Sequence, residues 1–251
     1  MERLFNIGEI AGFFQIPAST LRYWEETGVI SPGKNPENNY REYSVSDLMI
    51  ISDVLFYKNL GLPLKQIRNM EQITPEDQEK LFAGKIRELK NQQQEIENRI
   101  QKLQNRLRAF EMMKELKRNP FSLEDIDTEC IVTFELIEIE KLHKYIGNPY
   151  LYSRVQHSKE IDREQRGLTV SGEESDLIPD EKKLWKKGKS KYVTCLMKEE
   201  ITDGYPNNLE ELVEQVQKTY KTGYIISRFL LCAQEDGKLY DFYKTYIEIL
   251  P

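Results

Sequence analysis

The chain has 251 residues, 31% of them charged, and a formal net charge of −6 at pH 7. Apolar residues make up 39% of the chain, which suffices for folded cores, and no run of 18 apolar residues is present. These values exclude a membrane-spanning helix and a protein that binds nucleic acid through overall positive charge.

The acidic excess lies in residues 119–251, which carry 18 basic and 25 acidic side chains. The N-terminus lacks the apolar stretch of a signal peptide, so we expect a cytoplasmic protein. The three cysteines are widely spaced in apolar runs, as is typical of reduced core residues. Neither they nor His143 and His157 have the spacing of metal ligands, so we expect no metal site and no cofactor.

Residues 6–28 have the pattern of two short helices joined by a tight turn. Asn6 caps a helix that runs through Gln15, and a second helix from Ala18 to Glu26 ends at Gly28. Leu21 and Trp24 face inward in this pattern. The outward side chains, which a helix-turn-helix presents to a DNA major groove, are Ser19, Thr20, Arg22 and Tyr23.

Residues 29–43 are rich in turn-forming residues and close in a short strand, which predicts a small hairpin. Such a hairpin directly behind a helix-turn-helix is a wing, and Arg41 and Tyr40 would contact the phosphate backbone. A solvated surface hairpin is the alternative. Ser44 starts a helix to Leu60, and one further turn places Lys65 near a phosphate.

The stretch from Thr74 to Arg118 predicts one long helix with an apolar heptad seam. The seam residues are Phe82, Ile86, Leu89, Ile96, Ile100, Leu103, Leu107 and Phe110, with Gln93 in the remaining slot. A stripe this narrow fits a coiled-coil partner, and Gln93 would set its register. The alternative is a long helix that packs within its own chain.

Residues 119–251 alternate between strand and helix patterns and predict an α+β domain with an antiparallel sheet. The segment from Arg163 to Lys191 fits no template. The expected strands are Cys130–Ile137, Gly167–Ser171, Tyr192–Lys198, Ile225–Ala233 and Phe242–Leu250, and the expected helices are Ile139–Tyr145 and Asn208–Tyr220.

Four motifs occur in order within the first 70 residues: Asn6-Ile7-Gly8-Glu9-Ile10-Ala11, residues 19–30, Asn39-Tyr40-Arg41-Glu42-Tyr43 and residues 60–67. With these motifs, the first 70 residues resemble the DNA-binding domain of the MerR family of bacterial transcription regulators. The resemblance implies a homodimer with antiparallel paired helices, bound to a palindromic promoter. It also implies that the protein bends and untwists the promoter spacer so that RNA polymerase engages both promoter elements. Trp24 departs from the tyrosine usual in the family.

The C-terminal layout and the strand Tyr246-Ile247-Glu248-Ile249 resemble the GyrI-like effector domain of multidrug-binding MerR regulators. That resemblance implies a site for a hydrophobic, cationic effector, with aromatic walls and a buried carboxylate. Ten of the 14 tyrosines lie in this region. The expected ligand residues are Tyr150, Tyr152, Tyr192, Tyr246 and Glu248, although Glu248 also fits an exposed edge-strand carboxylate.

We therefore expect a winged helix-turn-helix in residues 1–73, a dimerisation helix in residues 74–118 and an effector domain in residues 119–251. Two other interpretations stay open: a hydrolase-like C-terminal domain tethered to DNA, and a coiled-coil interaction protein that does not bind DNA. No nucleophile motif or glycine-rich phosphate loop is apparent, so we expect no catalytic residues and no enzyme.

Overall fold

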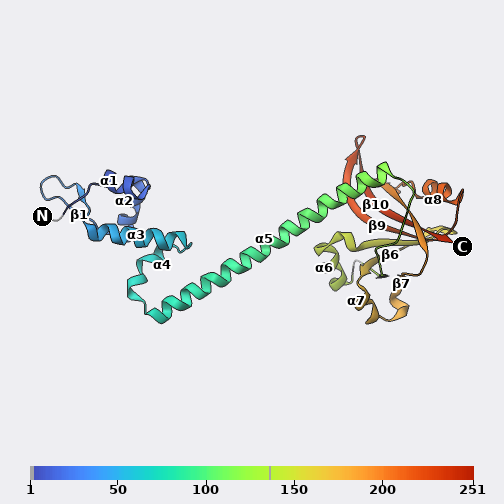
Figure 1. Cartoon of the computed structure of the whole chain (residues 1–251), viewed down its shortest axis with the longest axis horizontal. Coiled ribbons are helices and arrows are strands. Elements are labelled where there is room, and N and C mark those ends of the chain that lie inside the picture. Colours follow the sequence, from blue (N-terminus) through green and yellow to red (C-terminus); the bar gives the residue numbers. More distant parts are fainter. Residues whose placement is uncertain (1–2, 136) are drawn as a thin grey trace. The chain divides into compact units, whose positions relative to one another are not determined.

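The computed structural model describes residues 3–135 and 137–251. The chain divides into two compact units, Met1–Glu95 and Ile96–Pro251, with the division inside one long helix. Figure 1 shows the elements of each unit. Among the described residues, no helix has the length and apolarity needed to cross a bilayer.

The first unit begins with two short helices, α1 (Ile7–Phe14) and α2 (Ala18–Glu26). The Asn6 side chain accepts hydrogen bonds from the backbone N–H groups of Gly8 and Glu9, and the Glu9 carboxylate accepts one from the Asn6 N–H. This capping box fixes the start of α1, where the sequence predicted Asn6 as the cap. Gln15, with a left-handed φ of 53°, ends α1 and turns the chain toward α2.

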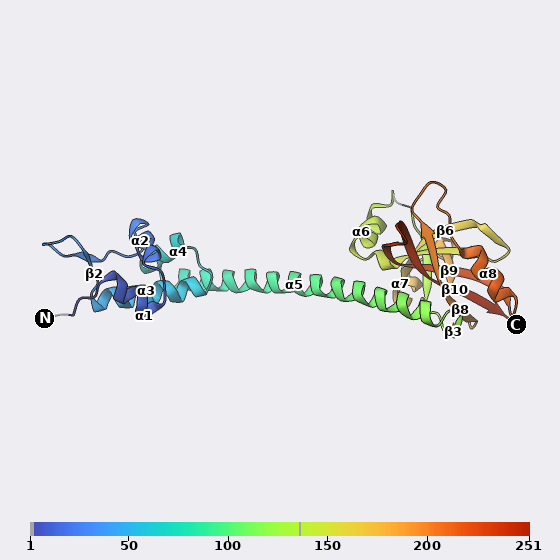
Figure 2. The same ribbon diagram turned by 90° about the horizontal axis from the view of Figure 1, so that it is seen from above.

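The remaining elements of this unit are a two-stranded hairpin and two helices. Strands β1 (Gly33–Lys34) and β2 (Arg41–Glu42) pair antiparallel. Figure 2 shows the loop between them extending away from the helices. A second capping box, between Ser44 and Asp47, starts α3 (Val45–Asn59), which is followed by α4 (Leu64–Arg68) and a 3-10 turn, η1 (Met70–Gln72).

The core of the first unit is formed by side chains from α1, α2, α3 and the hairpin. Leu21 is 0% exposed and Trp24 is 3% exposed, so both face inward as predicted. They pack with Ile10, Tyr43 and Ile51. The opposite side of α2 is therefore free to carry polar side chains to the surface.

The predicted long helix is present as α5 (Pro75–Arg118). Thr74 accepts a hydrogen bond from the Asp77 N–H, and Glu76 and Asp77 place negative charge at the helix N-terminus. Most seam residues are strongly exposed within one chain; Ile100 is 49% exposed, Leu103 67% and Leu107 63%.

The second unit is built around an eight-stranded antiparallel sheet in the order β3-β8-β10-β9-β5-β6-β4-β7. Its strands are β3 (Ser122–Glu124), β4 (Cys130–Thr133), β5 (Tyr152–His157), β6 (Glu160–Val170), β7 (Lys183–Lys186), β8 (Lys191–Glu200), β9 (Lys221–Glu235) and β10 (Lys238–Leu250). Its helical segments are α6 (Ile139–Gly147), η2 (Pro149–Leu151), α7 (Gly172–Asp176), η3 (Asp180–Lys182) and α8 (Leu209–Gln217).

This sheet is strongly curled. Trp185 lies on the edge strand β7 and Tyr192 lies on β8, near the other edge, yet their ring centroids are 6.5 Å apart. Both rings belong to a buried cluster that also contains Tyr246. We call the face that carries these rings the concave face.

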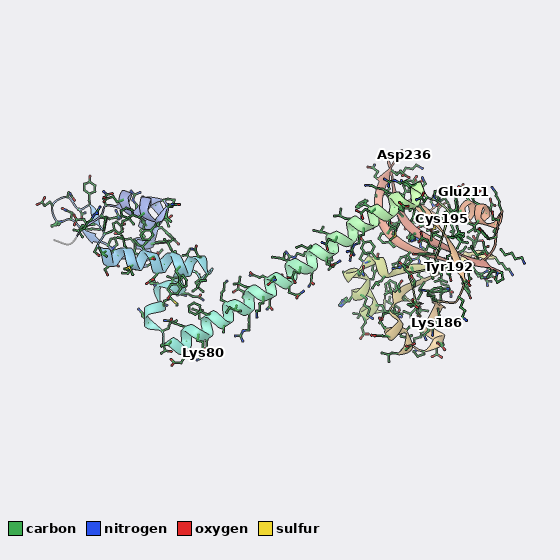
Figure 3. All side chains as sticks on the ribbon, in the orientation of Figure 1. Lys80, Lys186, Tyr192, Cys195, Glu211 and Asp236 are labelled. Carbon is green, nitrogen blue, oxygen red and sulfur yellow. The ribbon has the colours of Figure 1, made fainter. Side chains whose placement is uncertain are left out.

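Different helices cover the two faces of the sheet. Helix α8 packs on Cys195 and Met197, whereas the end of α5 packs in a cluster that includes Leu196. Because neighbouring side chains of a strand point to opposite faces, α8 and the end of α5 lie on opposite faces. Figure 3 labels Tyr192, one of the residues that define the concave face, within this unit.

Several strand predictions needed correction. The strand predicted for Cys130–Ile137 ends at Thr133; Leu136 lies outside the described residues, and Ile137 is 84% exposed. The segment predicted as Gly167–Ser171 is only the end of the longer β6. The segment from Arg163 to Lys191, which fitted no template beyond the strand at Gly167–Ser171, contributes to β6 and contains α7, η3 and β7.

Candidate nucleic-acid interface and ligand cavity

The outward face of α2 presents the predicted polar residues. Ser19, Arg22 and Tyr23 are exposed, and Thr20 is half-buried. Residues three and four apart share one helix face, so Ser19, Arg22 and Tyr23 project together. This face can offer a hydroxyl, a guanidinium and an aromatic ring to a nucleic acid.

The hairpin residues differ in how free they are. Tyr40 is 73% exposed at the hairpin, whereas the Arg41 side chain is 33% exposed. The Arg41 Nε donates a hydrogen bond to the Glu25 carboxylate at the end of α2. This ion pair joins the hairpin to α2 and partly neutralises the charge that was predicted to contact phosphate. Lys65 is exposed on α4.

The predicted ligand residues do not form a single group. Tyr152 packs on the α8 face of the sheet. Tyr192 and Tyr246 lie on the concave face, with ring centroids 6.3 Å apart. Tyr150 and Tyr246 line one cavity, while Tyr192 and Glu248 line a second hollow of about 500 Å³.

The Glu248 carboxylate has a local hydrogen-bond partner. Its Oε2 accepts a hydrogen bond of 2.8 Å from the Tyr224 backbone N–H, beside an irregularity in the pairing of β9 and β10. A Cβ at Gly223 would collide with this carboxylate. Burial, and the negative charge of Glu248, raise the pKa of Tyr192 to about 12.

The cavity that Tyr150 and Tyr246 line has a volume of about 350 Å³, within the range typical of small-molecule sites. We call it the α5 cavity, because Asn105, Arg108, Ala109 and Met112 of α5 form one wall. Asp127, Arg228 and Lys244 add charged groups from the sheet side. Only Tyr150 and Tyr246 of this lining were predicted, because the other residues come from segments far apart in the chain.

Comparison with known proteins identifies the N-terminal unit. Residues 5–72 match the family model of the MerR HTH family regulatory proteins. The transcriptional activator TipA of Streptomyces coelicolor is 32% identical over 63 residues, which are 25% of this chain and 25% of TipA. The multidrug-efflux transporter 2 regulator of Bacillus subtilis is 32% identical over 68 residues, 27% of this chain and 25% of the regulator. The match thus spans about a quarter of each relative.

Two solved structures show a weaker likeness. The N-terminal part of MtaN, the multidrug transporter activator of Bacillus subtilis, is 22% identical and covers 41% of this chain and 97% of that one, with a TM-score of 0.38. An EcmrR–DNA complex is 15% identical and covers 98% of this chain and 100% of the other, with a TM-score of 0.37. Both TM-scores are low, so the assignment rests on the sequence match: residues 5–72 are a helix-turn-helix domain of the MerR family.

Proposed function

We propose that this protein binds promoter DNA as a homodimer and regulates transcription in response to a small molecule. The observation that carries the proposal is the MerR-family match of residues 5–72, combined with the exposed polar face of α2. The relatives named above are transcription regulators and not enzymes, which favours a regulator over a tethered hydrolase.

In this proposal, α2 enters the major groove and the hairpin acts as a wing on the DNA backbone. Ser19, Thr20, Arg22 and Tyr23 contact the groove and its edges, because recognition helices read base edges with such side chains. Phosphate contacts from Tyr40, Arg41 and Lys65 then fix the position of the domain without reading the sequence.

Dimerisation would use the apolar seam of α5. Apolar side chains at heptad spacing that are exposed in one chain are buried when two such helices pair as a coiled coil. The exposure of Ile100, Leu103 and Leu107 supports this pairing. Two reading heads at a fixed separation match a palindromic site, and one rigid geometry can impose one distortion on the DNA.

Activation would follow from bending and untwisting of the promoter spacer, which lets RNA polymerase engage both promoter elements. The second unit would act as the effector domain, with a GyrI-like fold. Its antiparallel sheet, its buried aromatic rings and its α5 cavity support a ligand-binding role. The curled sheet gives such a site a rigid wall.

Arg41 gives the sharpest test of the DNA interface. We expect Arg41→Ala to weaken binding to a promoter fragment about equally for all sequences, since phosphate contacts carry no sequence information. The slope of log affinity against log salt should become shallower by about 0.9 for each phosphate that the variant no longer neutralises. Glu25→Gln should instead strengthen DNA binding and make the salt slope steeper, because it releases the Arg41 guanidinium from its ion pair.

Gel shifts at several salt concentrations measure both variants. Lys80→Ala is the matched control, because Lys80 is an exposed cation on α5 whose ion pair with Asp77 is local to the helix. An unchanged salt slope in Arg41→Ala would remove the hairpin from the interface. Failure of the wild type to shift any promoter DNA would instead favour a coiled-coil interaction protein.

A further inference from the structure

The α5 cavity has an unusual balance of charge for the cationic effector that the sequence suggested. Three of its lining residues, Arg108, Arg228 and Lys244, are basic, and Asp127 is its one acidic lining residue among those described. Glu248, the carboxylate predicted to hold a cation, lies at the other hollow and is bonded to the Tyr224 backbone. A cation in the α5 cavity would therefore meet mainly like charge.

The Asp127 carboxylate is already engaged by protein donors. Its Oδ1 accepts from the Arg228 Nη1 at 2.6 Å and from the Thr128 hydroxyl at 3.3 Å. Burial raises the pKa of the Asp127 carboxyl, but the Arg228 guanidinium and a hydrogen bond from Tyr246 outweigh that effect and lower it. Asp127 is thus ionised and paired with Arg228, which partly neutralises the one acidic group of the lining.

Hydrogen-bond donors, in contrast, remain available around the cavity. Arg108 has five N–H donors, and its only hydrogen bond among the described residues is a long one of 3.4 Å to Asn105. The Arg228 Nε is buried and lacks an acceptor within the described part of the chain. Lys244 donates to Glu124 at 2.6 Å and has further N–H groups. The lining therefore has an excess of donors over acceptors.

The rest of the lining is apolar or aromatic. Ala109, Met112, Leu230 and Tyr150 belong to one packed cluster beneath the end of α5. The Tyr246 ring lies below the Lys244 ammonium, 4.9 Å from nitrogen to centroid. An occupant that satisfies this lining must bury an apolar body and present an acceptor group with negative charge.

We infer that the α5 cavity binds an aromatic carboxylate, whose ring packs on Met112 and Tyr150 and whose carboxylate faces Arg108. The regulatory meaning of this site rests on the proposed function, because an effector role needs a DNA-binding protein to act on. Binding itself does not depend on DNA. The occupant would touch α5 directly, at Arg108, Ala109 and Met112.

Isothermal titration calorimetry of the full-length protein can separate charge from shape. The three probes are 2-naphthoate, 2-naphthamide and 2-naphthylmethylammonium, which share one ring system and carry negative, zero and positive charge at pH 7.5. We expect the anion to bind about tenfold more tightly than the amide, and the cation to bind most weakly. Equal affinities, or tightest binding of the cation, would overturn the inference.

A matched pair of variants locates the site. Arg108→Gln removes an exposed charge without opening the core, and should weaken 2-naphthoate binding about threefold to tenfold while leaving 2-naphthamide unchanged. Lys114→Gln removes an exposed charge from the same helix outside the cavity and should leave both affinities unchanged. Equal losses in the two variants would show a diffuse charge effect and would refute the site.

The proposed function has a separate readout. Gel shifts without any naphthyl compound measure DNA binding, which Arg108→Gln should not alter. Absence of naphthoate binding together with normal DNA shifts would overturn the cavity inference alone. Naphthoate binding without any DNA shift would uphold the cavity and overturn the regulatory function.

Discussion

Arg154 and Glu199 form a buried ion pair inside the second unit. The Nη1 and Nη2 atoms each lie 2.6 Å from a carboxylate oxygen of Glu199, and the two side chains are 8% and 7% exposed. The Arg154 Nη2 also donates to the Tyr243 hydroxyl, and Glu164 lies 3.1 Å from Nη1. Burial lowers the pKa of Arg154, but the hydrogen bonds to Glu199 and the electrostatic effects of Tyr243, Glu164 and Glu199 together raise the pKa by more than burial lowers it, so the guanidinium stays charged.

We expect Glu199→Ala to lower the free energy of unfolding by about 3 kcal/mol, because it leaves a buried guanidinium with only part of its partners. Replacement of both partners, as Arg154→Met with Glu199→Leu, should recover most of that stability. Urea denaturation measures both effects. Glu160→Ala breaks the exposed pair with Arg163 and should cost under about 1 kcal/mol. A similar cost for Glu160→Ala and Glu199→Ala would contradict this account.

The same ion pair shows why β5 escaped prediction. Tyr152–His157 carries Arg154 and Gln156 where a buried strand normally carries apolar residues. Their partners are Glu199 on β8 and the Ile161 carbonyl on β6, and no local pattern indicates such contacts. Polar residues in a strand become compatible with burial only through these partners.

At the scale of elements, local chemistry explains the predictions that succeeded. The capping boxes at Asn6 and Ser44 involve residues within three positions, so the starts of α1 and α3 were readable from the sequence. Strand ends depend on the neighbouring strands, and β9 and β10 extend beyond their predicted bounds because they pair along nearly their whole length. The α5 cavity could not be predicted, because its lining residues Arg108, Asp127 and Arg228 come from segments that are far apart in the chain.

The seam of α5 supports a prediction about assembly. Leu103 is 67% exposed and belongs to no buried cluster among the residues that the structure describes, so Leu103→Asp should leave each subunit folded. In a paired coiled coil this leucine is buried once in each helix, and each burial contributes about 1.5–3 kcal/mol. We therefore expect Leu103→Asp to convert a dimer into a monomer at micromolar concentration.

Sedimentation velocity measures the oligomeric state, and circular dichroism confirms that the subunit keeps its helix content. Lys102→Asp is the control, because Lys102 is exposed on the same helix but outside the seam. Lys102→Asp introduces the same carboxylate side chain as Leu103→Asp. If Leu103→Asp stays dimeric, the two chains pair through another surface and the seam has a different role.

At the scale of the whole molecule, α5 is one continuous helix that contributes to both units. Phe82 packs against the core of the first unit, and Ala109 and Leu116 are buried in the second. A ligand in the α5 cavity would contact this helix between Arg108 and Met112. In the proposed function, α5 therefore connects the unit that binds DNA with the unit that binds the ligand, although a shared element does not by itself establish coupling.

Linkage gives a strict test of that coupling. If 2-naphthoate changes the affinity for a promoter fragment by some factor, the fragment must change the affinity for 2-naphthoate by the same factor. We expect a factor of about five or more, measured by calorimetry in one direction and fluorescence anisotropy of labelled DNA in the other.

Arg108→Gln should weaken naphthoate binding and leave the DNA affinity of the ligand-free protein unchanged. Leu103→Asp should weaken DNA binding but keep naphthoate binding, because the α5 cavity lies within one subunit. A factor of one in both directions would mean that the cavity binds a ligand without regulating the reading of DNA.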